Sequence, residues 1–77
     1  TLQDKTFVVT GSVNHYKNRD ELKADIVAHG GTVVGSVSSK TSYLINNDIN
    51  STSSKNQKAK FLGIPIISED QFLEMLK

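Results

Sequence analysis

The chain contains no cysteine and no tryptophan, and it has one proline and one methionine among 77 residues. Without cysteine it can build neither a disulfide framework nor a thiolate metal site. No apolar run approaches the ~20 residues that a membrane-spanning helix needs, and the chain starts with neither a signal peptide nor an initiator methionine. We therefore expect a cytoplasmic piece of a longer protein, with no membrane partner.

An excess of charge of one sign is also missing. Nine basic and eight acidic residues give a formal net charge of +1, so the total charge does not indicate a nucleic-acid-binding protein. The distribution is uneven, because residues 31–60 contain four lysines and one aspartate, whereas the final segment is acidic. A local basic face from the middle of the chain is therefore expected.

The hydrophobic share of 36% is enough for one small folded domain over residues 1–77. Its pattern centres on Lys5–Gly11, where an apolar run at residues 7–9 is followed by Thr10 and Gly11. Such a short run is typical of a parallel strand that is buried on both faces. Because α/β folds bind ligands beyond the carboxyl ends of their strands, Thr10 and Gly11 are candidate binding residues.

Three oxygen-bearing residues in front of periodic apolar patterns predict the starts of three helices. Each has a Glu or Gln three residues later, as a capping box requires. Glycines predict the ends of the first two helices. The caps are Asn18, Ser54 and Ser68, and the helix-ending glycines are Gly30-Gly31 and Gly63.

Three further runs, at residues 32–34, 43–45 and 64–67, have the β-branched and aromatic residues typical of strands. Pro65 cannot donate to a ladder, so it is expected at the start of its strand or at the edge of the sheet. The resulting order β-α-β-β-α-β-α has no two-residue hairpin. It predicts an α/β fold with a four-stranded parallel sheet and helices on both faces.

No arrangement of residues typical of an enzyme is present. His15 and His29 lie in different segments without partners at metal-ligand spacing, and we interpret them as exposed histidines of a loop and a helix end. The glycine-rich run 30–35 follows a helix and precedes a strand, the reverse of a dinucleotide-binding fingerprint. We therefore predict no catalytic residue, metal ligand or cofactor site in this domain.

The predicted second helix begins with cations. With Ser54 as its cap, Lys55 falls at the first helical position and Lys58 at the fourth, and no acid accompanies them. A helix N-terminus is itself positive, so this arrangement favours an anion, usually phosphate. If the first strand lies beside the third, Lys55 would converge with Thr10 and Gly11 on one phosphate. The alternative is that Lys55 is an ordinary solvated lysine.

Together these segments resemble the BRCT domain over nearly the whole chain. The variety is similar to the single C-terminal module of bacterial NAD-dependent DNA ligases and to the module in the large subunit of replication factor C. Exonucleases and other repair proteins with one such module remain alternatives. The matching stretches are Lys5–Gly11, Arg19–Leu22 with Gly30-Gly31, Gly35–Ile45, and Ser54-Lys55 with Lys58-Ala59 and Leu62–Ile67.

The resemblance implies a sheet of order 2-1-3-4, with the first and third helices on one face and the second on the other. It also implies a phosphate pocket, in which Thr10 and Gly11 match the family's Ser/Thr-Gly pair. Lys55 matches the lysine that starts the second helix, with Lys58 as the alternative, and Arg19 matches an arginine of DNA-end-binding members. A departure lies in the last helix, where Phe72 stands in place of the family's tryptophan.

The function implied by the resemblance is that of a non-catalytic module of an NAD-dependent DNA ligase in DNA replication and repair. It would bind nicked or 5′-phosphorylated duplex as a monomer, and NAD, Mg and Zn are expected only in the parent ligase. The alternative is a protein-interaction module that docks the parent onto replication or repair proteins through its acidic last helix or an apolar patch. Phosphopeptide binding typically uses a tandem pair of modules, and one is present here.

Overall fold

Four short parallel strands form one sheet, as the sequence pattern predicts, and their order β2-β1-β3-β4 is the one that the family resemblance implies. The computed structural model describes residues 2–48, 50 and 52–76 of the chain. Its central strands are β1 (Thr6–Val9) and β3 (Tyr43–Ile45), and its edge strands are β2 (Thr32–Val33) and β4 (Ile66–Ile67).

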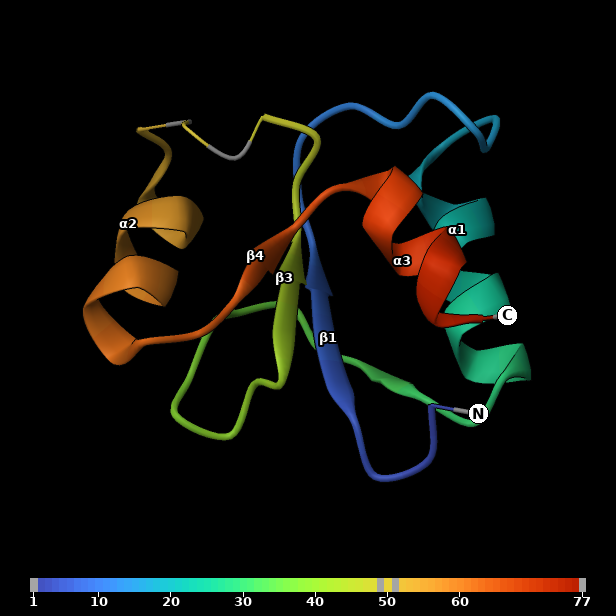
Figure 1. The fold of residues 1–77 in the computed structure, drawn as a ribbon, viewed down its shortest axis with the longest axis horizontal. Helices are drawn as coiled ribbons and strands as arrows, with labels where there is room; N and C mark the ends of the chain where they lie inside the picture. The colour runs from blue at the N-terminus through green and yellow to red at the C-terminus, as the bar shows by residue number, and fades with distance from the viewer. Residues whose placement is uncertain (1, 49, 51, 77) are drawn as a thin grey trace.

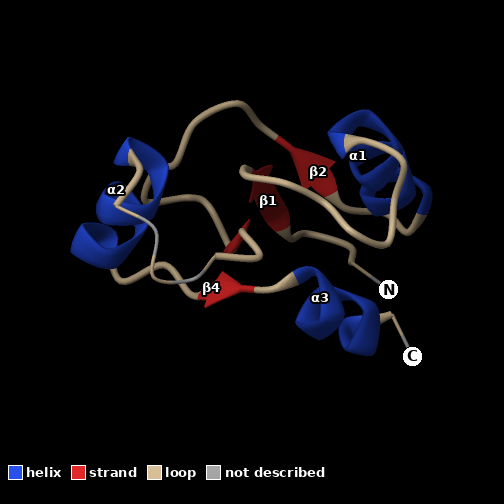
Figure 2. Ribbon diagram, turned by 90° about the horizontal axis from the view of Figure 1, so that it is seen from above, coloured by secondary structure: helices blue, strands red, loops and turns tan. Residues whose placement is uncertain are grey.

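Three helices cover the two faces of this sheet. They are α1 (Arg19–Ala28), α2 (Ser54–Leu62) and α3 (Glu69–Met75). Figure 2 shows α1 and α3 on one side of the strands and α2 on the other, which confirms the predicted layers. Within the described parts of the chain, no helix has the length and apolar character needed to cross a membrane.

The alternation of side chains along the strands builds two cores. In β1, Phe7 and Val9 face α1 and α3, whereas Val8 faces α2. Phe72 of α3 is fully buried and meets the ring of Phe7 edge to face, with 5.8 Å between centroids. Phenylalanine therefore fills this core position without a tryptophan. The larger core contains Leu2, Phe7, Val9, Leu22, Ile26, Ile45, Ile67 and Phe72, and the smaller contains Val8, Val37, Leu44 and Ala59.

The helix caps agree with the sequence at α1 and α3 and differ by one residue at α2. Asn18 caps α1, and Ser68 and Gln71 form a complete capping box at α3. The prediction of Ser54 as the cap of α2 is wrong: Ser53 is the cap and accepts a bond from the backbone N–H of Asn56. Both serines can cap a helix, and the helix begins one residue later than the cap that is used, at Ser54.

The last strand is shorter than residues 64–67, because only Ile66 and Ile67 pair with β3. Pro65 lies immediately before β4 and outside it, and β4 is an edge strand, so the expectation of an edge position is met. The Pro65 carbonyl still accepts a bond from the Leu44 N–H at 3.0 Å. The first residue of the predicted β2, Thr32, pairs with Thr6, and Val34 lies just outside the strand.

The carboxyl ends of β1 and β3 lie at the same edge of the sheet, because these strands are parallel neighbours. Two polar loops leave the sheet at this edge, one from β1 to α1 and one from β3 to α2 (Figure 1). The amino ends of α1 and α2 are thereby brought to the same edge, where the sequence predicts binding residues.

Burial of Phe72 predicts a large loss of stability on truncation. Phe72→Ala should lower the free energy of unfolding by about 3–5 kcal/mol, since it opens a cavity under Phe7. Phe61 is the matched control, because its side chain is 88% exposed and Phe61→Ala removes the same atoms from water. Urea unfolding followed by circular dichroism measures both, and equal midpoints for the two variants would contradict the described core.

Candidate functional site

Thr10 and Gly11 line a hollow of about 380 Å³ at the carboxyl edge of the sheet. The rest of its lining comes from Ser12 in the same loop, from the loop that follows β3 and from the cap of α2. Most of these groups are neutral hydrogen-bonding side chains, and Asp48 is the acid among them. The lining residues are Thr10, Gly11, Ser12, Asn46, Asn47, Asp48 and Ser53.

Gly11 is held against Asn46 in a conformation suited to glycine. Its φ is +78°, and a Cβ atom built at this position would lie 2.7 Å from the Asn46 side-chain oxygen. Asn46 is buried, donates from Nδ2 to Asn56 Oδ1 at 2.8 Å, and accepts from the Asp48 N–H at 3.0 Å. The bond to Asn56, which is itself buried in the first turn of α2, joins that helix to the end of β3.

Arg19 lines a second hollow of about 510 Å³ beside the first. The two hollows share Gly11 and Ser12, so they meet along the backbone that leaves β1. Lys17 also lines the second hollow, so two cations from the start of α1 flank it. Lys17 is not among the residues that the sequence predicts for the site.

Lys55 and Lys58 line a third, smaller hollow of about 140 Å³. Its other wall is the segment Gly35–Val37, which leaves β2. Because Ser53 is the cap, Lys55 is the second helical residue and Lys58 the fifth, one place later than predicted. Both side chains lie along the flank of α2 that faces residues 35–37.

The five predicted site residues therefore divide among three hollows. Gly11 shares a lining with Thr10 and also with Arg19, whereas Lys55 and Lys58 line the hollow between α2 and the loop after β2. Convergence of Thr10, Gly11 and Lys55 on one phosphate stays a prediction.

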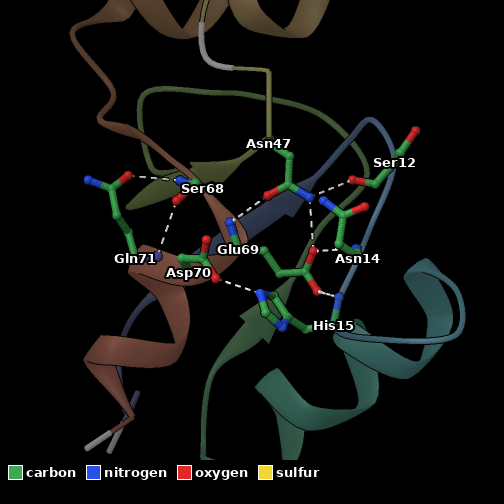
Figure 3. Close-up of polar contacts among 8 residues, drawn as sticks. All are labelled: Ser12, Asn14, His15, Asn47, Ser68, Glu69, Asp70 and Gln71. Atoms are coloured by element: carbon green, nitrogen blue, oxygen red, sulfur yellow. Dashed lines mark hydrogen bonds and ion pairs between the residues drawn. The ribbon is translucent and has the colours of Figure 1, made fainter.

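A buried carboxylate fixes the loop from β1 to α1 in place. Glu69 is the first residue of α3 and is 1% exposed. Its carboxylate accepts the backbone N–H groups of Asn14 at 2.6 Å and His15 at 2.5 Å (Figure 3). Asn47 bonds Glu69 twice, accepting from its N–H at 2.8 Å and donating to its carboxylate at 2.9 Å, and donates to the Ser12 carbonyl at 2.8 Å.

The pKa of Glu69 is lower than usual because of these donors. Burial by itself raises the pKa of the carboxyl, but the Asn47 amide and the N–H groups of Asn14 and His15 stabilise the charged form and give a net decrease. The carboxylate is therefore an internal anchor, and it is not a surface acid of the last helix available to a partner.

Two further contacts hold the same loop. The Tyr16 hydroxyl donates to the Asp25 carboxylate of α1 at 2.5 Å. Burial raises the pKa of Tyr16, as do this bond and the nearby negative charges, so the hydroxyl remains a donor. His15 pairs with Asp70 of α3 at 2.5 Å (Figure 3). The loop is thus attached to α1 on one side and to α3 on the other.

The two histidines lie where the sequence predicts, one in the loop after β1 and one at the end of α1. Their side chains are 47% and 41% exposed. In the described ranges 2–48, 50 and 52–76, no three His, Cys, Asp or Glu residues lie close enough together to hold a metal ion. The site offers hydrogen-bond donors, acceptors and cations, which suit the binding of an anion.

The residues that sequence reasoning missed are amides and an acid that act by long-range contacts. Asn46 and Asn47 directly follow β3, and that position at the carboxyl edge was an available signal. In the sequence Glu69 is one acid of an acidic final segment, and its backbone partners lie 54 and 55 residues away along the chain. No local pattern identifies such partners.

Replacing Glu69 by Gln should destabilise the domain, because Gln offers one acceptor oxygen where the carboxylate has two and carries no charge. We expect a loss of roughly 2 kcal/mol near pH 7. The folded pKa lies below the ordinary value of 4.5, so the stabilisation is present above pH 4.5 and is lost as the pH falls through the folded pKa.

Unfolding of wild type and Glu69→Gln by urea between pH 7 and pH 3 tests this. The difference in free energy should shrink as the pH falls below 4.5. Asp70→Asn is the control, since it removes an exposed carboxylate from the same helical turn and should have a much smaller effect. A difference between wild type and Glu69→Gln that stays constant with pH would disprove the role of the charge.

Gly11→Ala should cost more stability than Gly63→Ala. Both glycines have a left-handed φ, +78° and +73°, so both variants incur a backbone cost of about 1–2 kcal/mol. Only at Gly11 would the new Cβ also displace Asn46, since the Cβ position at Gly63 has no atom of a residue distant in the chain within 4 Å. Thermal melts of the two variants measure the difference, and equal losses would show that Asn46 moves freely.

Curated relatives of this chain are named DNA ligase. One from Lachnoclostridium phytofermentans is 59% identical over 75 residues, and one from Ruminiclostridium cellulolyticum is 62% identical over 75 residues. Each of these alignments covers 97% of this chain, but only 12% and 11% of the relative. A DNA ligase from Phocaeicola vulgatus is 46% identical over 76 residues, 99% of this chain and 11% of the relative. The chain thus spans about a tenth of the length of the curated relatives it matches.

A solved structure with the same fold is the crystal structure of Rad4 BRCT1,2 in complex with a Mdb1 phosphopeptide. It superposes with a TM-score of 0.82 at 16% identity, covering 97% of this chain and 39% of that chain. The model of the BRCA1 C Terminus (BRCT) domain matches residues 1–76. With the sheet order and helix layers described above, this match shows that the chain belongs to the BRCT domain family.

Proposed function

We propose that this chain is the BRCT module of a DNA ligase and that it binds DNA without taking part in catalysis. The observation that supports this most directly is the meeting of two loops and two helix N-termini, from α1 and α2, at one edge of the sheet. The relatives named DNA ligase support the choice of parent. Sealing of nicks, and the NAD, Mg and Zn that it requires, would belong to other domains of that parent.

The proposed contacts are with phosphates of nicked or 5′-phosphorylated duplex. Arg19 and Lys17 supply charge at the hollow that contains Gly11, and Thr10 supplies a hydroxyl in the adjoining hollow. Lys55 and Lys58 supply charge along α2. Because these cations line separate hollows, the proposal favours contacts with several phosphates of a strand over one deep pocket. Such contacts fix position without reading sequence.

Salt dependence is the first test of this proposal. With about four phosphates neutralised, the affinity should fall about a hundredfold between 50 and 200 mM salt, whatever the base sequence. Fluorescence anisotropy of this chain with labelled nicked duplex, with and without the 5′ phosphate, measures this fall. Equal and negligible binding of both duplexes at low salt would refute the proposal.

Removal of one proposed phosphate contact should reduce the slope of this dependence. Lys55→Ala is expected to weaken binding uniformly across sequences and to lower the salt slope by about 1. Lys40→Ala makes the same change of charge at an exposed position before β3, at the opposite edge of the sheet, and should leave both quantities unchanged. Equal effects of the two variants would remove Lys55 from the site.

Docking onto other proteins is the competing outcome. Asp70 and Glu74 remain exposed on α3, whereas the burial of Glu69 reduces the acidic surface that such a partner could use. Amide shifts confined to residues 68–76 on addition of another ligase domain, with no response to DNA, would favour docking.

A further inference from the structure

Phe61 is the most exposed large apolar side chain in the described part of the chain. It lies near the end of α2 and is 88% exposed. Its neighbours Leu62 and Ile64 are partly buried and pack against the smaller core. Phe61 therefore contributes little to the core, and the face of its ring is accessible to a ligand.

The chemistry around Phe61 is cationic. Helix α2 contains three lysines and no acidic residue. Lys55, Lys58 and Phe61 follow one another at intervals of three, so they form a row of neighbours on the helix surface. The row rises about 4.5 Å per step, or about 9 Å in all, from the hollow at the start of α2 toward its end.

We propose that Phe61 is a stacking platform for an unpaired base of a DNA strand whose phosphates lie along Lys55 and Lys58. This inference rests on the proposed DNA-binding function and extends it to a substrate class, a duplex end with a single-stranded stretch. Single-strand-binding surfaces combine a positive track for the backbone with aromatic rings for the bases, and α2 presents both.

Charge complementarity favours a DNA strand over an apolar protein surface as the occupant. The fully buried centres of protein interfaces are depleted in lysine, because burial removes water from the ammonium group. Lys58 lies one turn before Phe61, and Lys60 is adjacent to it in the chain. A partner covering Phe61 would contact these lysines too, and a polyanion gains from that contact.

The test compares two DNAs that differ only in an unpaired stretch. One is a blunt duplex with a 5′ phosphate, and the other has the same duplex with a short single-stranded overhang. Wild type should bind the overhang DNA more tightly, by about fivefold or more. Phe61→Leu keeps an apolar side chain without a π face and should lose this preference, whereas Phe61→Tyr should retain it. Both variants should bind the blunt duplex as wild type does.

A fluorescence measurement detects stacking directly. The chain has no tryptophan, so Phe61→Trp introduces a single reporter. Its emission should be quenched on addition of overhang DNA and much less on addition of blunt duplex. Val27→Trp is the control, because Val27 is 60% exposed near the end of α1, on the other face of the sheet, and its emission should not respond.

Several results would overturn the inference. Equal binding of overhang DNA by wild type and Phe61→Leu would overturn the stacking role of Phe61. If Lys55→Ala still weakened DNA binding in that case, the proposed DNA-binding function would stand and only the stacking role would fall. Equal quenching in the Phe61→Trp and Val27→Trp variants would also count against stacking. Loss of binding to another protein domain in Phe61→Leu, with DNA binding unchanged, would assign Phe61 to a protein partner. Absence of binding to either DNA by wild type would refute the proposed function itself.

Discussion

The candidate site depends on the burial of one carboxylate, that of Glu69. A charged group taken out of water is costly unless donors satisfy it, and here three N–H groups and their geometry do so. Two of these donors belong to the backbone of the loop after β1. Movement of that loop away from α3 would therefore leave the buried carboxylate without two of its hydrogen bonds. The loop that precedes α1 is therefore positioned by α3, a helix that follows it by more than fifty residues.

A second buried polar contact fixes the other side of the site, where β3 ends and α2 begins. The buried pair Asn46 and Asn56 joins the end of β3 to the first turn of α2. Asn46 also lies against Gly11, so the end of β1, the end of β3 and the start of α2 are fixed relative to one another. Neutral amides are suited to this role, because they orient backbone and helix without adding a charge that would oppose a phosphate.

The fold could be predicted because its signals are local, and the site could be predicted only in part because its contacts are not. Asn18, Ser68 and Gly63 act within one helical turn, and the apolar run of β1 fits a buried parallel strand whatever surrounds it. The cap of α2 shows the limit. The sequence favours Ser54, because Gln57 follows three residues later as in a capping box, yet Ser53 is the cap, and the adjoining Asn56 is bonded to Asn46, ten residues away.

That single residue matters for the proposed site, because the positive end of a helix extends over its first turn only. A cap one place earlier moves Lys55 and Lys58 one position farther from the amino end of α2, and both line the hollow beside Gly35–Val37. The positive charges of Lys55 and Lys58, one of which was predicted to meet Thr10 and Gly11 at a single phosphate, thus lie along the flank of α2. Arg19 lies at the start of α1, on the opposite side of the loops. Cations separated in this way match the spaced charges of a nucleic-acid backbone better than a lone anion, since each phosphate can find its own partner. In the proposed complex, a strand that follows Lys55 and Lys58 would next meet the exposed ring of Phe61 along α2.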